Sequence, residues 1–160
     1  MNFSQYIVQL VDNLFLTYRL GNENISLNMN IDEDIFFGMD TAVPLGILIN
    51  ELVSNSLKHA FYGRDKGEIK IELLREENGE SKTKGCKSTT FTLSVSDNGV
   101  GIPEDLDIED LDSLGLQLVT TLVDQLDGEL ELKRNYGTEF IIKFTVRGNT
   151  DQELAPAQYN

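Results

Sequence analysis

The apolar residues of this chain change their spacing several times, and the order of those changes constrains the fold more than any other feature. Residues 4–20 carry apolar side chains at steps of three and four, which predicts an amphipathic helix ending at Gly21. Apolar and polar residues alternate over 25–31, which predicts a half-buried strand instead. A chain that switches between the two spacings must pack helices against a sheet.

The remaining segments continue this pattern. A second helix is expected, capped by Asp40 or Thr41, with Pro44 in its first turn and its end at about Phe61. A third helix is expected over 116–127, before Gly128. Residues 76–90 are predicted to form an exposed hairpin loop, and 148–160 a disordered tail after a single domain of residues 1–147. Further strands are expected at 35–39, 69–73, 91–96, 129–133 and 138–146. The predicted fold class is α+β, a two-layer sandwich whose mixed, mostly antiparallel sheet is covered on one face by three helices.

The charge balance and the rare residues disfavour several functions. The 160 residues include 27 acidic and 13 basic ones, a net charge of −14, which disfavours nucleic-acid binding and direct contact with an anionic membrane. No apolar run is long enough to span a membrane, and the first residues do not resemble a signal peptide. A single cysteine makes no internal disulfide, which fits a reducing compartment, so we expect a cytoplasmic protein. The single cysteine, Cys86, is expected to be a free thiol on a loop, and a single histidine, His59, cannot build a zinc cluster.

The second helix carries the first group of candidate functional residues. At about 100° per residue, Glu51, Asn55 and Lys58 fall within roughly 60° of arc, with His59 beside Asn55 on the same face. A carboxylate, an amide and an ammonium are thus presented together. The alternative is an ordinary solvated helix face. The opposite, core-facing stripe is formed by Ile49, Val53, Leu57 and Ala60.

Three glycine-containing segments form the other candidates. In 97–101 (DNGVG), a carboxylate at a strand end precedes two glycines. This carboxylate can accept a hydrogen bond from a ligand amine. The alternative is an ordinary turn, which often has the same composition. In 113–116 (SLGL), a loop enters a helix, which favours an anion site or simply an N-cap serine. Gly137 and Thr138 precede the last strand, where a hairpin turn is the alternative.

In this order, the four segments resemble the four boxes of the GHKL, or Bergerat-fold, superfamily of ATP-binding proteins. Residues 51–60 (ELVSNSLKHA) resemble its N box, 97–101 its G1 box, 113–116 its G2 box and 137–140 (GTEF) its G3 box. Residues 44–61 and 112–119 are similar to sensor histidine kinases whose acceptor domain is of the HisKA_2 type. The resemblance extends from the first helix to about Val146.

The resemblance implies roles for the N-box residues. Asn55 would bind Mg²⁺ through its side-chain oxygen, and Lys58 and His59 would meet the phosphates. Glu51 occupies the position of the general base of ATP-hydrolysing members, and here it would deprotonate or orient the attacking group. Its alternative role is to hold metal-bound water. The implied catalytic residues are therefore Glu51, Asn55 and Lys58.

The resemblance likewise assigns roles to the other three boxes. Asp97 would accept a hydrogen bond from the adenine 6-amino group, and Thr138 would line the adenine end. Gly99 and Gly101 would shape the pocket wall, while Gly115 and Leu116 would offer backbone N–H groups to the phosphates. Ser113 departs from the family, where many members have glycine, and the lid between Gly101 and Gly115 is short.

The function implied is that of the Mg-ATP-binding catalytic domain of a two-component sensor histidine kinase. It would transfer the γ-phosphoryl group of ATP to a histidine on a separate dimerisation domain, in the same protein or another chain, with a response regulator downstream. We expect no acceptor domain in these residues, because the only histidine lies within the N box. The alternatives are a serine kinase of the anti-sigma-factor kind and a non-catalytic module that senses nucleotide or binds a partner.

Overall fold

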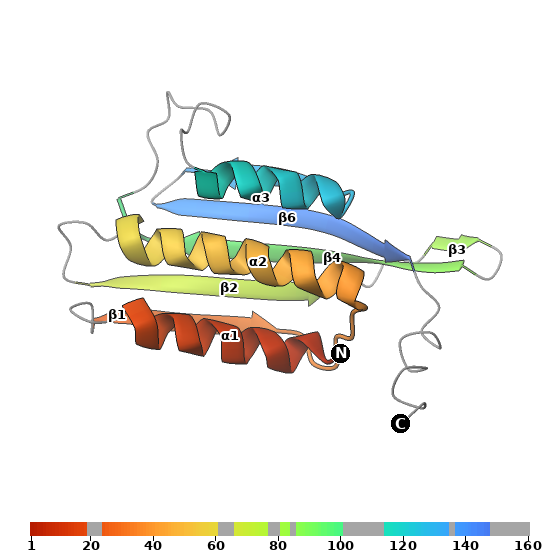
Figure 1. The fold of residues 1–160 in the computed structure, drawn as a ribbon, viewed down its shortest axis with the longest axis horizontal. Coiled ribbons are helices and arrows are strands. Elements are labelled where there is room, and N and C mark those ends of the chain that lie inside the picture. Colours follow the sequence, from red (N-terminus) through yellow and green to blue (C-terminus); the bar gives the residue numbers. More distant parts are fainter. Residues whose placement is uncertain are drawn as a thin grey trace.

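The protein is a two-layer sandwich in which one sheet is covered on one face by three helices (Figure 1). The computed structural model describes residues 1–18, 24–60, 66–76, 81–83, 86–100, 114–134 and 137–147. In chain order the elements are α1 (Phe3–Tyr18), β1 (Ile25–Ile31), α2 (Met39–Asn55), a π-helical turn η1 (Ser56–Ala60), β2 (Gly67–Arg75), β3 (Ser81–Thr83), β4 (Cys86–Asp97), α3 (Leu114–Gln125), β5 (Glu129–Lys133) and β6 (Thr138–Arg147). The predicted α+β class with helices on one face is confirmed.

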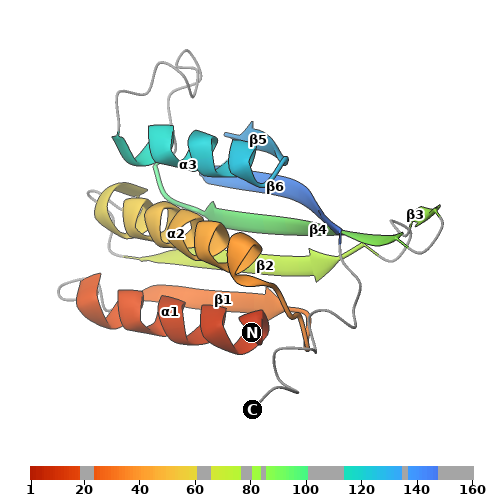
Figure 2. The same ribbon diagram turned by 45° about the vertical axis from the view of Figure 1, so that its right-hand side comes forward.

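The sheet has the strand order β1-β2-β4-β6-β5, and β3 adds a short pairing to β4. Strand β1 runs parallel to β2, whereas the pairs β2–β4, β4–β6 and β6–β5 are antiparallel. Parallel neighbours require a long crossover connection, and α2 lies within it. Figure 2 shows α2 between α1 and α3, with β5 beside β6 at the far edge. The helix that carries the N-box segment is thereby fixed over the middle of the sheet.

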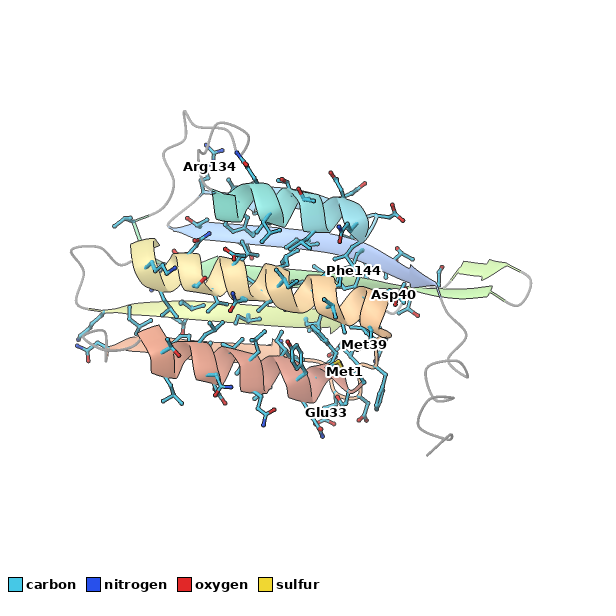
Figure 3. All side chains as sticks on the ribbon, viewed as in Figure 1. Met1, Glu33, Met39, Asp40, Arg134 and Phe144 are labelled. Carbon is cyan, nitrogen blue, oxygen red and sulfur yellow. The ribbon has the colours of Figure 1, made fainter. Side chains whose placement is uncertain are left out.

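The core lies between the helices and the inward-facing residues of the strands. Ile69, Ile71 and Leu73 of β2 are fully buried, and the polar residues that alternate with them face the open side of the sheet. At one end, the Phe37 ring packs against Phe91 and Phe144, with ring centroids 5.0 and 5.9 Å away. Figure 3 places Phe144 at the same end as Met39, where α2 begins. This aromatic cluster fills the core at the end of the sheet where α2 begins.

Several predicted boundaries are wrong. Residues 35–39 form no strand: Phe36 makes only an isolated bridge to Asn2, and Ile35 and Phe37 turn into the core. Helix α2 begins at Met39 after Gly38, so Asp40 and Thr41 are not its cap, and Pro44 lies inside the helix instead of in its first turn. The predicted loop 76–90 contains β3 and the start of β4, which includes Cys86.

Two further predictions cannot be compared with the structure. The tail 148–160 and the lid residues 101–113 lie outside the described residues. Among the described residues, no helix is long and apolar enough to cross a membrane.

Candidate functional site

Those predicted site residues that the structure describes lie at the end of the sheet opposite the aromatic cluster. Figure 1 shows the C-terminal end of α2, the N-terminal end of α3, the end of β4 and the start of β6 meeting there. The described residues of the N box and of the three glycine boxes, which are far apart in sequence, therefore lie at one end of the fold.

Asp97 stands at the centre of this end, as the last residue of β4. Its partner in the antiparallel ladder is Thr138, the first residue of β6, whose side chain is 8% exposed. Gly137 just before it has a φ of +120°, and a Cβ atom there would lie only 2.1 Å from the Asp97 carbonyl oxygen. Any side chain at 137 would push β6 away from β4, so glycine is required by both backbone angle and space.

Both carboxylate oxygens of Asp97 accept hydrogen bonds from within the chain. The backbone N–H of Gly99 donates to Oδ1 at 3.0 Å. The hydroxyl of Ser56, from the turn that follows α2, donates to Oδ2 at 2.9 Å. The carboxylate is thus fixed in orientation by its own loop on one side and by the N-box turn on the other.

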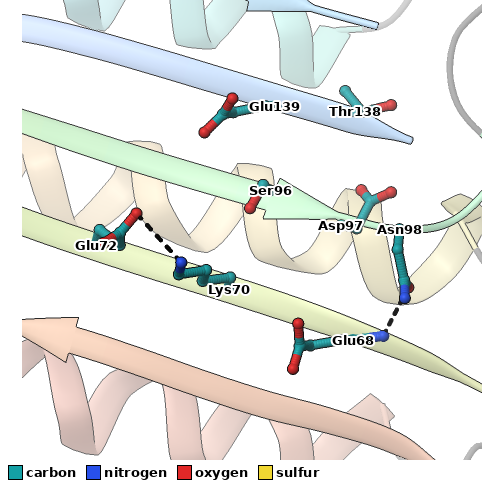
Figure 4. Close-up of a pocket in the computed structure, with 8 residues that line it drawn as sticks. All are labelled: Glu68, Lys70, Glu72, Ser96, Asp97, Asn98, Thr138 and Glu139. Carbon is teal, nitrogen blue, oxygen red and sulfur yellow. Dashed lines mark hydrogen bonds and ion pairs between the residues drawn. The ribbon is translucent and has the colours of Figure 1, made fainter. Parts of the chain in front are cut away.

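Asn98, the next residue, forms hydrogen bonds with the backbone of Glu68 in β2. Its side-chain Oδ1 accepts from the backbone N–H of Glu68 at 2.8 Å, and its own N–H donates to the Glu68 carbonyl at 3.2 Å (Figure 4). These bonds fasten the segment after β4 to the start of β2. Asn98 therefore acts in the structure as a clamp that holds Asp97 and Gly99 at the sheet end.

The N-box helix presents its residues largely as the helical wheel predicts. Ile49, Val53 and Leu57 are buried. Glu51 and Asn55 are half-buried, and Lys58 is exposed. The predicted core position Ala60 and the side chain of His59 lie outside what the structure describes.

The wheel did not predict the π-helical turn Ser56–Ala60 that follows Asn55. Such turns, with hydrogen bonds from i to i+5, occur frequently at functional sites. The sequence signal for Ser56 was its place beside Asn55. Its partner Asp97 is 41 residues away, so no local pattern could identify the bond.

Gly115, the glycine of the G2 box, lies at the N-terminal end of α3. Gly115 and Leu116 occupy the first turn of α3, where backbone N–H groups have no partner within the helix. The Leu116 side chain is buried, so its predicted role can involve only its backbone. Ser113 and Gly101 lie outside the described residues, and the structure does not test their predicted roles.

A hollow of about 260 Å³ on the open face of the sheet borders this end without being a nucleotide pocket (Figure 4). Its floor includes Glu68 and Glu72 of β2 and Glu139 of β6. Glu72 pairs with Lys70 at 3.7 Å, and Glu139 accepts from Ser94 at 2.8 Å. These carboxylates would repel a polyphosphate, whereas the ends of α2 and α3 lie on the opposite, helical face.

Comparisons with known proteins agree with this arrangement. The sequence model described as histidine kinase-, DNA gyrase B-, and HSP90-like ATPase matches residues 40–148. Among curated relatives, the sensor histidine kinase PdtaS of Mycobacterium tuberculosis is 34% identical over 67% of this chain and 20% of its own length. The serine-protein kinase RsbW of Listeria monocytogenes is 33% identical over 56% of this chain and 59% of its own length.

A solved structure covers more of the chain. The histidine kinase domain of the Erythrobacter litoralis EL346 blue-light-activated histidine kinase superposes with a TM-score of 0.74 and 28% identity, covering 90% of this chain and 61% of that one. The chain thus spans well under half of PdtaS and about three fifths of the other two proteins.

Proposed function

This chain belongs to the family of histidine kinase-, DNA gyrase B- and HSP90-like ATPases, and we propose that it is the Mg-ATP-binding catalytic domain of a two-component sensor histidine kinase. The observation that carries the proposal is the Asp97 carboxylate, which Ser56 and Gly99 hold at the sheet end beside Thr138. A fixed acceptor at this position suits the 6-amino group of adenine. Gly99, Gly101 and Thr138 complete the adenine pocket in this proposal.

The phosphates would extend from Asp97 toward the ends of α2 and α3. Lys58 and His59 from the N-box turn and the backbone N–H groups of Gly115 and Leu116 would bind them, because a helix N-terminus favours anions. This placement is supported by the meeting of both helix ends at the sheet end that carries Asp97.

Asn55 would hold Mg²⁺ through its side-chain oxygen. It is the last residue of α2 and half-buried, directly before the serine that contacts Asp97. Mg²⁺ is usually held by one or two protein oxygens together with substrate phosphates and several waters, so a single amide oxygen fits this metal. The metal would neutralise charge on the phosphates during transfer.

The transfer step assigns a role to Glu51. A ring nitrogen of the acceptor histidine would form a bond to the γ-phosphorus while the bond to the bridging oxygen breaks, and ADP would leave with that electron pair. Glu51, one helical turn before Asn55, would take up the proton that the imidazole loses. The acceptor would be a two-helix domain of the HisKA_2 type, a response regulator would receive the phosphoryl group next, and both would act in the cytoplasm.

The second candidate is a serine kinase of the anti-sigma-factor kind, which the likeness to RsbW supports. The histidine kinase proposal rests on a broader likeness, because the blue-light-activated kinase domain covers 90% of this chain and RsbW covers 56%.

Phosphoryl transfer to an added acceptor tests the two candidates. The chain is incubated with γ-labelled ATP, Mg²⁺ and a two-helix acceptor domain of the HisKA_2 type, with the same acceptor carrying glutamine for its histidine as the control. We expect label on the histidine-bearing acceptor alone, labile in acid and stable in base. Acid-stable label on an added anti-sigma-factor antagonist would support the serine kinase instead. Failure to bind ATP would refute both.

A further inference from the structure

We infer that Ser56 is a positioning residue that holds the Asp97 carboxylate in the orientation needed to recognise the amino group of adenine. The inference rests on the proposed ATP site and adds to it a residue that none of the four boxes assigns to the base. It is carried by the hydrogen bond from Ser56 Oγ to Asp97 Oδ2, at 2.9 Å.

Ser56 is itself firmly placed. Its side chain is only 9% exposed, and its backbone N–H donates to the carbonyls of Leu52 and Val53 at the end of α2. The hydroxyl therefore reaches Asp97 from a fixed support. With the Gly99 N–H on the other oxygen, the carboxylate is held by two donors from separate parts of the chain. Removing the hydroxyl takes away one of the donors that orient the carboxylate, so that the carboxylate meets the base in fewer productive orientations.

The position of Ser56 in the chain gives this contact a second consequence. It directly follows Asn55, the proposed metal ligand, at the start of the π-helical turn that carries Lys58. The hydrogen bond from Ser56 to Asp97 thus connects the proposed adenine-binding part of the site with the turn proposed to bind the phosphates. A nucleotide that engages Asp97 stabilises the turn on which its own phosphates bind.

Ser54 provides a matched control. It is also a buried serine, 5% exposed, and lies two residues earlier. Its hydroxyl donates to the backbone carbonyls of Asn50 at 2.6 Å and Glu51 at 3.3 Å, both within its own helix. Ser54→Ala and Ser56→Ala remove the same atom at similar burial, and only the second removes a bond to Asp97.

The test measures the affinity of each variant for ATP and for purine riboside triphosphate, which lacks the 6-amino group. We expect the wild type to prefer ATP by about tenfold, as one hydrogen bond to a charged group implies. Ser56→Ala should reduce this preference to about two- or threefold, whereas Ser54→Ala should leave it unchanged. Ser56→Thr, which keeps the hydroxyl, should retain more of the preference than Ser56→Ala. Because both nucleotides are measured on the same protein sample, a lower folded fraction cancels in the ratio.

The outcomes separate this inference from the proposed function. If the wild type prefers ATP over purine riboside triphosphate and Ser56→Ala shows the same preference, the role of Ser56 is refuted and the proposed ATP site stands. A wild type that binds both nucleotides equally refutes the role of Asp97, and that of Ser56 with it. If circular dichroism shows that Ser56→Ala does not fold, Ser56→Cys gives the same comparison, because a thiol is only a weak donor.

Discussion

Replacement of Gly137 by alanine tests the packing that places Asp97. The new Cβ would lie 2.1 Å from the carbonyl oxygen of Asp97 and 2.9 Å from the Cα of Asn98, so both contacts are with backbone that cannot rotate away. Relief requires β6 to separate from β4 at the point where Thr138 pairs with Asp97. The φ of +120° adds strain of about 1–3 kcal/mol for a residue with a side chain.

The total cost follows from these terms. Strain of about 2 kcal/mol and the loss of one or two ladder hydrogen bonds, about 1 kcal/mol each, give a destabilisation of roughly 3–4 kcal/mol. For a domain of this size, each kcal/mol lowers the melting temperature by about 2–4 °C. We therefore expect Gly137→Ala to melt about 10 °C below the wild type in a calorimetric scan without nucleotide.

Gly38→Ala is the matched control. Its Cβ would meet only Asp40 Oδ1, at 2.9 Å, which is the end of a flexible side chain, and the φ of −68° suits any residue. The cost should stay below about 1 kcal/mol. A melting temperature of Gly137→Ala within about 2 °C of the wild type would show that β4 and β6 tolerate a side chain there, and the packing argument would be wrong.

Ligand measurements test the proposed site residues directly. Asp97→Asn should weaken ATP binding by about tenfold, because the uncharged amide accepts a weaker hydrogen bond. The wild type should bind GTP poorly, and equal affinities for ATP and GTP in calorimetry would refute the role of Asp97. Asn55→Ala should spare adenosine binding and reduce the gain in ATP affinity that Mg²⁺ provides; a gain equal to that of wild type would make Asn55 an ordinary surface residue. The chain alone should bind ATP without labelling itself from γ-labelled ATP, and label that persists in His59→Gln would reveal another acceptor.

The architecture was predictable because it depends on local periodicity. The alternation in β2 and the three- and four-residue steps of α1 both follow from which side chains are buried, and the structure buries Ile69, Ile71 and Leu73 on one face as expected. The error at 35–39 has a physical cause. Ile35 and Phe37 are buried by packing against the core, with only one bridge in place of a ladder, and apolar spacing cannot distinguish the two.

The site was predictable only in part, because its contacts join distant segments. Asp97 and Asn55 stood out through their surrounding motifs. Ser56 and Asn98 did not, because their partners Asp97 and Glu68 are 41 and 30 residues away. The π-helical turn was missed for a related reason: a wheel at 100° per residue assumes an α-helix throughout.

The aromatic cluster contacts β4 at its middle and the proposed nucleotide site lies at its C-terminal end, so we expect two parts of this strand to behave differently. Phe91, the sixth of the 12 residues of β4, packs against Phe37 and Phe144, and Asp97 lies six residues further along, about 20 Å away in an extended strand. Backbone amides beside Phe91 should therefore exchange with deuterium through global unfolding, whether or not nucleotide is bound. Amides from Val95 onward should exchange through smaller local openings, which ATP would suppress. Binding of ATP would then slow amide exchange in only one half of this strand.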